Sequence, residues 1–147
     1  MLGYVDGAHV SYYRSTERRT APDTEFTVSE LADLPRVDVA YSYAGADGAA
    51  IDAFVAAGAK GIISAGFAPG GTTDMQRDAL VQAKAAGVVI VQSTRAGSGV
   101  VHIGTRLGKL GFLSADNLNP QKARILLSLA LTISSDPDEI VRIFATY

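Results

Sequence analysis

The chain has 147 residues, of which 48% are hydrophobic and 19% charged, and its formal net charge is −2. This length suits one domain with its own core, and the composition is that of an ordinary globular protein. The small net charge argues against a nucleic-acid partner or an anionic membrane surface, and the absence of cysteine excludes disulfides and thiolate metal sites. The two histidines, His9 and His102, lack metal-ligand spacing, so we expect no metal and no cofactor.

The beginning of the chain predicts a β-hairpin followed by a linker. Two β-type runs, residues 2–5 and 9–13, flank Asp6 and Gly7, which form a strong hairpin turn signal. Residues 15–33 are polar, and we expect them to cross a surface as a linker. The first residues lack the basic stretch and apolar core of a signal peptide, and no apolar run approaches the ~20 residues of a membrane span.

From residue 34 onward, strands and helices alternate regularly. Four β-rich runs predict strands, at residues 37–43, 61–65, 88–92 and 112–115. The third run, VVIVQ, has the continuous apolar character of a buried parallel strand. The segments VAAGAKGIISAG and KAAGVVIVQS each pass from a helix end through Ala-Gly into an apolar strand, which is the periodicity of a βα unit.

Four helices are predicted, each with a recognisable start. The predicted caps are Asp47, Thr73 in a capping box with Gln76, Asn119 before Pro120, and Asp136 with Glu139. Residues 125–131 are apolar nearly all round, which predicts a buried helix, whereas residues 93–111 are rich in glycine and predict a loop. We therefore expect an α/β fold, a Rossmann-like parallel sheet of about four strands flanked by helices. This domain spans residues 34–147, and the hairpin and linker occupy residues 1–33.

A ligand is expected at one edge of this sheet, because open parallel sheets bind ligands at the carboxyl ends of their strands. Small and polar residues follow the predicted strands there, which leaves backbone groups approachable. The candidate substrate-proximal residues are Pro69, Gly70, Gly71, Thr72, Arg95 and Ser98.

The sequence at this edge does not support a nucleotide site or a threonine nucleophile. The stretch GFAPGG has the glycine spacing of a phosphate loop but is followed by Thr72 and Thr73 instead of Lys and Ser or Thr. The dinucleotide pattern G-x-G-x-x-G follows none of the strands. A threonine nucleophile needs a base within reach, and Asp74 is adjacent, yet Thr73 and Asp74 fit a helix cap and first turn better.

Several charged and aromatic residues allow two interpretations. Arg95 follows the third strand and suits either a carboxylate ligand or a structural pair with Asp116. Arg18 and Arg19 are interpreted as solvated residues of the linker instead of a ligand clamp. The tyrosines at positions 41 and 43 are interpreted as core and rim residues instead of catalytic phenols.

Four segments and the ending IFATY together resemble the C-terminal domain of bacterial type II L-asparaginases and glutaminase-asparaginases. The segments are LPRVDVAYSYAGAD at 34–47, AGAKGIISAG at 57–66, VVIVQSTRAGSG at 88–99 and LNPQKARILLSLALT at 118–132. The resemblance implies an amidohydrolase that converts L-asparagine to L-aspartate and ammonia through a threonine nucleophile. It places the catalytic threonines, one of them in a TGGT motif, in an N-terminal domain, and this chain contains no TGGT. It also implies docking with that N-terminal domain, a homo-oligomer, and an active site shared with a neighbouring subunit.

The chain departs from the family pattern in two loops. Where the family often has a substrate-side asparagine within a GNGN-like stretch, this chain has Gly71. The family also often supplies a glutamate from the loop before its GFV strand, but residues 100–110 contain no acidic residue. Neither contact carries over, so the resemblance does not fix the preference between asparagine and glutamine.

Three functions therefore follow from the sequence, in decreasing order of support. The first is the C-terminal half of an asparaginase, inactive alone. The second is a free-standing regulatory or assembly module with the same fold, and the third is a small nucleotide- or phosphate-binding protein. The resemblance implies a periplasmic parent protein, while the lack of a signal peptide in this chain leaves a cytoplasmic location open.

Overall fold

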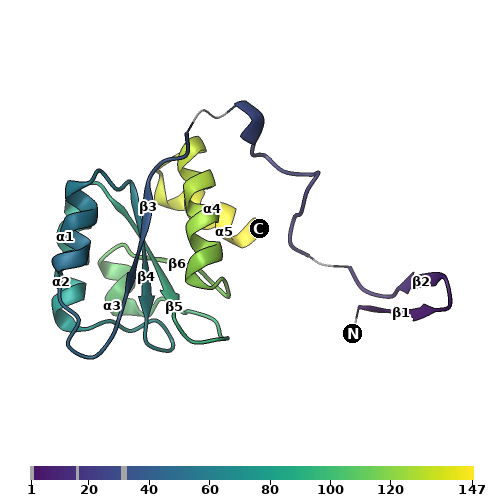
Figure 1. Cartoon of the computed structure of the whole chain (residues 1–147), viewed down its shortest axis with the longest axis horizontal. Coiled ribbons are helices and arrows are strands. Elements are labelled where there is room, and N and C mark those ends of the chain that lie inside the picture. Colours follow the sequence, from purple (N-terminus) through teal and green to yellow (C-terminus); the bar gives the residue numbers. More distant parts are fainter. Residues whose placement is uncertain (1, 16, 31–32) are drawn as a thin grey trace.

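The structure, a computed structural model, describes residues 2–15, 17–30 and 33–147 (Figure 1). One parallel sheet has the strand order β3-β4-β5-β6. Its strands are β3 (Val37–Tyr41), β4 (Gly61–Gly66), β5 (Val89–Thr94) and β6 (Leu113–Ser114). The predicted parallel α/β architecture is thus confirmed, although β3 ends two residues early and β6 is only two residues long.

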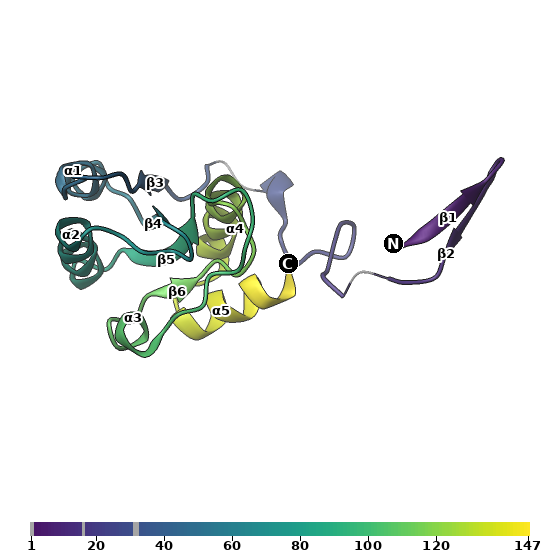
Figure 2. The ribbon, with the colours of Figure 1, turned by 90° about the horizontal axis from the view of Figure 1, so that it is seen from below.

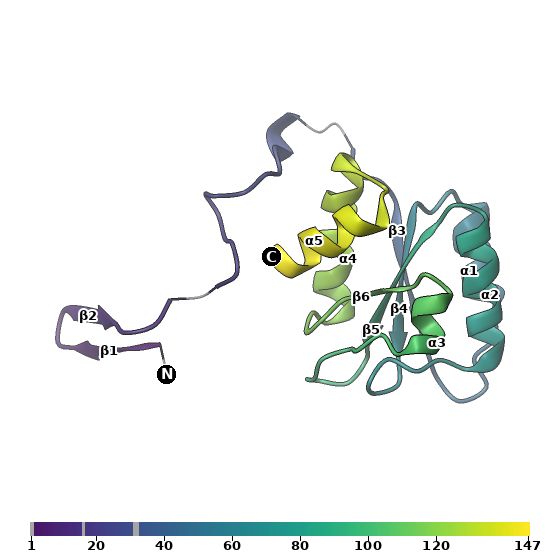
Figure 3. The same cartoon turned by 180° about the vertical axis from the view of Figure 1, so that it is seen from behind.

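Helices cover both faces of the sheet (Figures 1 and 3). On one face lie α1 (Ala49–Ala56), α2 (Asp74–Ala85) and α3 (Thr105–Lys109), and on the other lie α4 (Pro120–Ile133) and α5 (Pro137–Thr146). Because side chains alternate along a strand, each strand supplies both cores. Ile62 and Ile90 pack toward α1–α3, while Ile63 and Val91 pack toward α4 and α5.

The caps of α2 and α4 lie where the sequence predicts them. Thr73 accepts a hydrogen bond from the Gln76 amide at 3.2 Å, and Asn119 accepts one from an amide in the first turn of α4 at 2.9 Å. The capping box is only half formed, because the Gln76 side chain donates instead to the carbonyl of Tyr41 at 3.1 Å. That bond ties the start of α2 to the end of β3.

The other two caps differ in detail from the prediction. The cap residue of α1 is Gly48, and Asp47 accepts a hydrogen bond from the first amide of the helix at 3.1 Å. At α5, Asp136 accepts from a first-turn amide at 2.9 Å, as a cap should. Glu139, which the sequence placed in this cap, instead forms an ion pair with Arg142 one turn later in α5, at a distance of 2.7 Å.

Three expectations about exposure and loops are wrong. The predicted loop over residues 93–111 contains the helix α3, too short to give a periodic signal. Tyr41 is 44% and Tyr43 57% exposed, so neither belongs to the core. Helix α4 is buried on one face only, and Ile125 is 50% exposed because it points away from the sheet.

The N-terminal hairpin stands apart from the sheet and its helices (Figure 2). It pairs β1 (Gly3–Asp6) with β2 (His9–Tyr12) antiparallel, as predicted. Gly7 has φ +59° in the turn, a conformation that glycine adopts at little cost. Among the residues described, no helix combines the length and apolar character required to cross a bilayer.

The linker lies against the surface of the domain, and Arg18 and Arg19 contact the domain instead of being solvated as the sequence suggested. The Arg19 amide donates to the Thr146 carbonyl at 2.9 Å, and the Glu25 amide donates to the Tyr147 hydroxyl at 2.9 Å. Glu25 also pairs with Arg142, and hydrogen bonds to Glu139 and then Glu25 raise the pKa of Arg142. A short 3-10 helix, Val28–Glu30, follows, whereas three linker residues (16, 31 and 32) lie outside the described part of the chain.

Candidate functional site

The carboxyl ends of the strands place two loops side by side. The last residue of β4, Gly66, is opposite the last residue of β5, Thr94, so the segments that follow start at the same edge. The Arg95 amide donates to the Gly66 carbonyl at 2.9 Å and continues this pairing by one residue. In a parallel sheet this edge is where ligands bind.

The loop after β4 is a tight turn closed by its own backbone. Phe67 and Gly71 form an antiparallel bridge, with hydrogen bonds of 2.6 and 2.7 Å in the two directions. Gly70 has φ +123° and is buried, and a Cβ atom there would lie 2.9 Å from the Val101 side chain. Glycine is therefore required at position 70 both by conformation and by space.

Arg95 lies over the aromatic ring of this turn. Its guanidinium carbon is 4.7 Å from the ring centroid of Phe67, within the range of a cation–π contact. The alternative pairing of Arg95 with Asp116 is wrong, because Asp116 pairs with Arg18. Arg95 is exposed and faces solvent at the sheet edge, so its charge remains available to an anionic group.

The six candidate residues do not form one compact cluster. The turn and the ring of Phe67 bring Gly70 and Arg95 together, whereas Ser98 is exposed and, within the described ranges, forms no hydrogen bond to the turn. The remaining three flank the turn: Pro69 and Gly71 are exposed and Thr72 is partly buried. Phe67 was not selected from the sequence, although an aromatic residue inside a glycine-rich loop was an available signal.

The threonine beside the turn, Thr73, is not available as a nucleophile, because its hydroxyl is already engaged in hydrogen bonds. The Thr73 hydroxyl donates to the Ala46 carbonyl at 2.7 Å and accepts from the Gln76 amide at 3.2 Å. Its neighbour Asp74 forms an ion pair with Arg77 on the same helix, 2.5 Å away. The cap predicted for Thr73 is confirmed. In the described part of the chain, no group of three or more His, Asp or Glu side chains is placed so that it could hold a metal ion.

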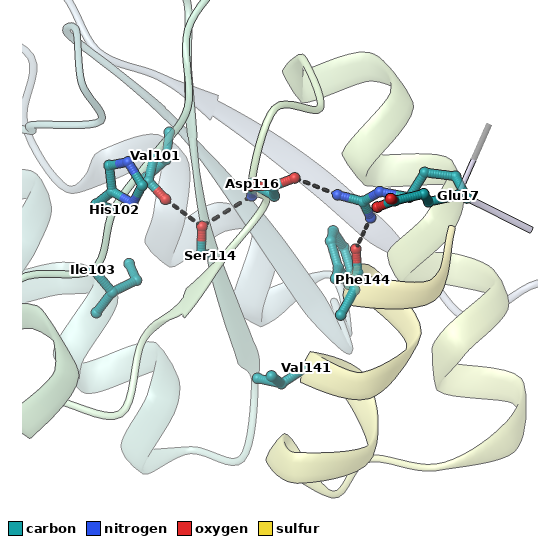
Figure 4. Close-up of a pocket in the computed structure, with 10 residues that line it drawn as sticks. Glu17, Val101, His102, Ile103, Ser114, Asp116, Val141 and Phe144 are labelled. Carbon is teal, nitrogen blue, oxygen red and sulfur yellow. Dashed lines mark hydrogen bonds and ion pairs between the residues drawn. The ribbon is translucent and has the colours of Figure 1, made fainter. Parts of the chain in front are cut away.

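A second feature, missed by sequence reasoning, adjoins the same edge. A cavity of about 490 Å³ lies between the end of β6, residues 101–103, the linker and α5 (Figure 4). Arg18 donates to the Phe144 carbonyl at 2.6 Å and pairs with Asp116, whose backbone is left-handed at φ +53°. Arg18 and Asp116 are separated by 98 positions in the sequence, which explains why no local pattern predicts this pair.

Contacts within this cavity connect the linker to the edge loops. The Val101 amide donates to the Asp116 carbonyl at 2.9 Å, and the Asp116 amide donates to the Ser114 hydroxyl at 2.9 Å. Ser114 in turn donates to the Val101 carbonyl, and the Val101 side chain lies beside Gly70. The linker therefore reaches the turn after β4 through Asp116 and Val101.

We expect the substitution Arg18→Gln to release the linker from the domain. Loss of the charged contacts with Asp116 and the Phe144 carbonyl should raise the hydrogen-exchange rate of the Arg19 amide about tenfold. Exchange followed by NMR measures this rate. The variant Arg77→Gln, which removes two ion pairs on α2, should leave this rate unchanged. Equal rates in the two variants would contradict the assigned role of Arg18.

Comparisons with known proteins agree on one family. The model of the glutaminase/asparaginase C-terminal domain matches residues 36–144. L-asparaginase 2 of Escherichia coli is 40% identical over 99% of this chain and 42% of its own length, and the probable periplasmic L-asparaginase of Haemophilus influenzae is 38% identical with the same coverage. A crystal structure of the probable cytoplasmic L-asparaginase of Campylobacter jejuni superposes with a TM-score of 0.90 at 41% identity, over 99% of this chain and 48% of that one.

The chain thus spans less than half the length of these relatives. The matched residues include all four strands of the sheet, both edge loops and most of α5. A domain model that matches 36–144 of 147 residues defines the family. The chain belongs to the glutaminase/asparaginase C-terminal domain family.

Proposed function

We propose that this chain is the C-terminal half of an L-asparaginase-type amidohydrolase and has no activity of its own. The reaction adds water to the side-chain carbonyl of L-asparagine, breaks its C–N bond and releases L-aspartate and ammonia. The observation that carries the proposal is the 40% identity to Escherichia coli L-asparaginase 2 across 99% of this chain but only 42% of that enzyme. The family resemblance implies that the catalytic threonines belong to the half that this chain does not match.

The chemistry of the described residues supports the proposal that catalysis depends on the other half of the enzyme. Amide hydrolysis through threonine needs a nucleophile with a base in reach and donors placed for an oxyanion. Thr73 caps a helix and Asp74 pairs with Arg77, so neither is available. The domain instead presents a sheet edge with an exposed cation, Arg95, beside the turn at 67–71.

The role of that edge, we propose, is to complete the active site of a neighbouring subunit. Arg95 suits a carboxylate, and an amino-acid substrate carries one. The substrate-proximal set remains Pro69, Gly70, Gly71, Thr72, Arg95 and Ser98. Residues 34–147 form the domain that contributes this edge, and residues 1–33 lead into it.

The partners follow from the same reasoning. They are an asparaginase N-terminal domain and further copies of the asparaginase in a homo-oligomer. Relatives named periplasmic and cytoplasmic both match the chain, and the family resemblance favours the periplasm.

An ammonia-release assay tests the proposal. The purified chain should release no ammonia from L-asparagine or L-glutamine, and a mixture with a separately produced asparaginase N-terminal domain should release it. The variant Arg95→Met should raise KM for the mixture about tenfold without changing the thermal midpoint of the chain, because Arg95 is exposed. Turnover by the chain alone would refute the proposal, and a mixture that stays inactive would favour a free-standing assembly module.

A further inference from the structure

The two outer strands of the sheet, β3 and β6, differ in how much of their edge is open. β6 is only two residues long, and just beyond it Val101 and Asp116 form an antiparallel bridge. The Ser114 hydroxyl also donates to the Val101 carbonyl, so a neighbouring segment covers this edge. β3 has five residues and, in the described part of the chain, pairs with β4 alone (Figure 2). Its outer side is therefore where a further strand would pair.

Successive residues of β3 direct their backbone groups to opposite sides of the strand. The Arg36 carbonyl accepts a hydrogen bond from the Lys60 amide at 2.8 Å, at the start of β4. At the other end, the Ser42 amide donates to a carbonyl of β4 at 3.0 Å. The even-numbered residues from 36 to 42 thus face β4. The backbone N–H and C=O groups that point outward belong to the odd-numbered residues, Val37, Val39 and Tyr41.

Two side chains, one from each face of the sheet, reach this outer side. Arg124 of α4 donates through Nε to the Val37 carbonyl at 2.7 Å, and Gln76 of α2 donates through Nε2 to the Tyr41 carbonyl at 3.1 Å. Of the three outward carbonyls, only that of Val39 receives no hydrogen bond from the residues that the structure describes. An added strand would lie about 4.8 Å from β3, in the space that these two side chains occupy.

The residues of this edge suit pairing with an identical strand. Val37, Val39 and Tyr41 are of the β-branched and aromatic types that strands favour. If β3 of a second copy lay antiparallel to it, Val39 would be opposite Val39 and Val37 opposite Tyr41. Twofold symmetry would then bring the outward donors of each strand to the outward acceptors of the other. A second copy of this chain is therefore the partner that the edge fits.

We propose that the outer edge of β3 is a latent pairing surface for β3 of a second copy of this chain, and that Arg124 and Gln76 keep it closed. Each side chain occupies one end of the edge, so both must be removed to free all three outward carbonyls. The inference is independent of the proposed function, because a homo-oligomer that forms through other surfaces leaves this edge closed.

The test removes the two donors from the full 147-residue chain. The variants are Arg124→Met and the double variant Arg124→Met with Gln76→Met. Arg124 is exposed and Gln76 is buried, so the single variant keeps the test decisive if the double variant does not fold. The matched controls, Lys122→Met on α4 and Gln82→Met on α2, remove an exposed charge and an exposed amide from the same helices. Arg124→Lys keeps a charged donor at the edge.

Sedimentation velocity gives the mean mass, and hydrogen exchange of the Val39 amide reports whether the outer side of β3 is paired. The double variant should have about twice the mean mass of the unchanged chain at the same concentration, and its Val39 amide should exchange about tenfold more slowly as the concentration rises. Arg124→Met alone should slow this exchange about threefold. Arg124→Lys and both controls should match the unchanged chain in mass and in exchange.

Several results would overturn the inference. If the folded variants keep the mass and the Val39 exchange rate of the unchanged chain, the two side chains do not close the edge. If the variants associate while the Val39 amide still exchanges fast, they associate through another surface. If Lys122→Met or Gln82→Met associates to the same extent, the loss of any polar side chain has this effect. Slow, concentration-dependent exchange of Val39 in the unchanged chain would show that the edge is already paired.

Discussion

Replacing Leu127 with alanine is expected to lower the free energy of unfolding by about 3 kcal/mol. Leu127 is fully buried in α4 and packs over the sheet among Ile63, Val91 and Ile143. It also fits against Gly61, where an added Cβ would lie 2.7 Å from a Leu127 methyl carbon. Truncation leaves a cavity that the close packing of the helix on the glycine cannot refill.

The substitution Ile125→Ala on the same helix is the control. Ile125 is 50% exposed, so its truncation removes little buried area and should cost less than about 1 kcal/mol. Urea denaturation followed by circular dichroism gives both values. Similar losses in the two variants would contradict the assignment of one buried face to α4.

The substitution Gly66→Ala is expected to open the turn after β4 and to destabilise the chain by about 2 kcal/mol. A Cβ atom at this position would lie 2.5 Å from the carbonyl carbon and oxygen of Gly70 and would also meet the Gly71 oxygen. These are backbone atoms of a closed turn, so they cannot move aside as a side chain does. The bridge between Phe67 and Gly71 should break, and the contact of Arg95 with Phe67 should be lost.

Gly71→Ala in the same turn provides the matched comparison. A Cβ atom there would meet nothing within 4 Å, so stability should change by less than about 0.5 kcal/mol. Thermal unfolding of the two variants checks the difference, and the NMR shifts of Phe67 report the state of the turn. Equal stability of Gly66→Ala and Gly71→Ala would show that the turn is not closed as described.

The fold was largely predictable because its signals are local. Apolar runs of five or six residues mark β4 and β5, and a side-chain oxygen next to the first helical turn marks the start of α2 and of α4. Tyr41 was misplaced because the sequence pattern marks a strand but not which strand of the sheet is outermost. Its strand is at the edge, where the ring extends into solvent and its hydroxyl accepts from Gln121 at 2.7 Å.

The specific contacts of the linker with the domain, and the cavity beside them, were not predictable because they depend on contacts between residues that are distant in the sequence. Arg18 and Asp116 form an ion pair although they are 98 positions apart in the sequence. The residues next to each of them give no pattern that would predict the pair. The edge of the sheet was predictable from topology, since every strand of a parallel sheet ends there. The stacking of Arg95 on Phe67 was not, because it requires the turn at 67–71 to fold the ring back beneath the guanidinium.

The most direct test of the account is a titration in which the chain is added to a fixed amount of an asparaginase N-terminal domain while ammonia release from L-asparagine is followed. We predict no release by either component alone, a rate that rises with each addition, and a plateau at one chain per N-terminal domain. Release by the chain alone, or a rate that stays at zero through the titration, would contradict the claim that this chain is the inactive half of an amidohydrolase.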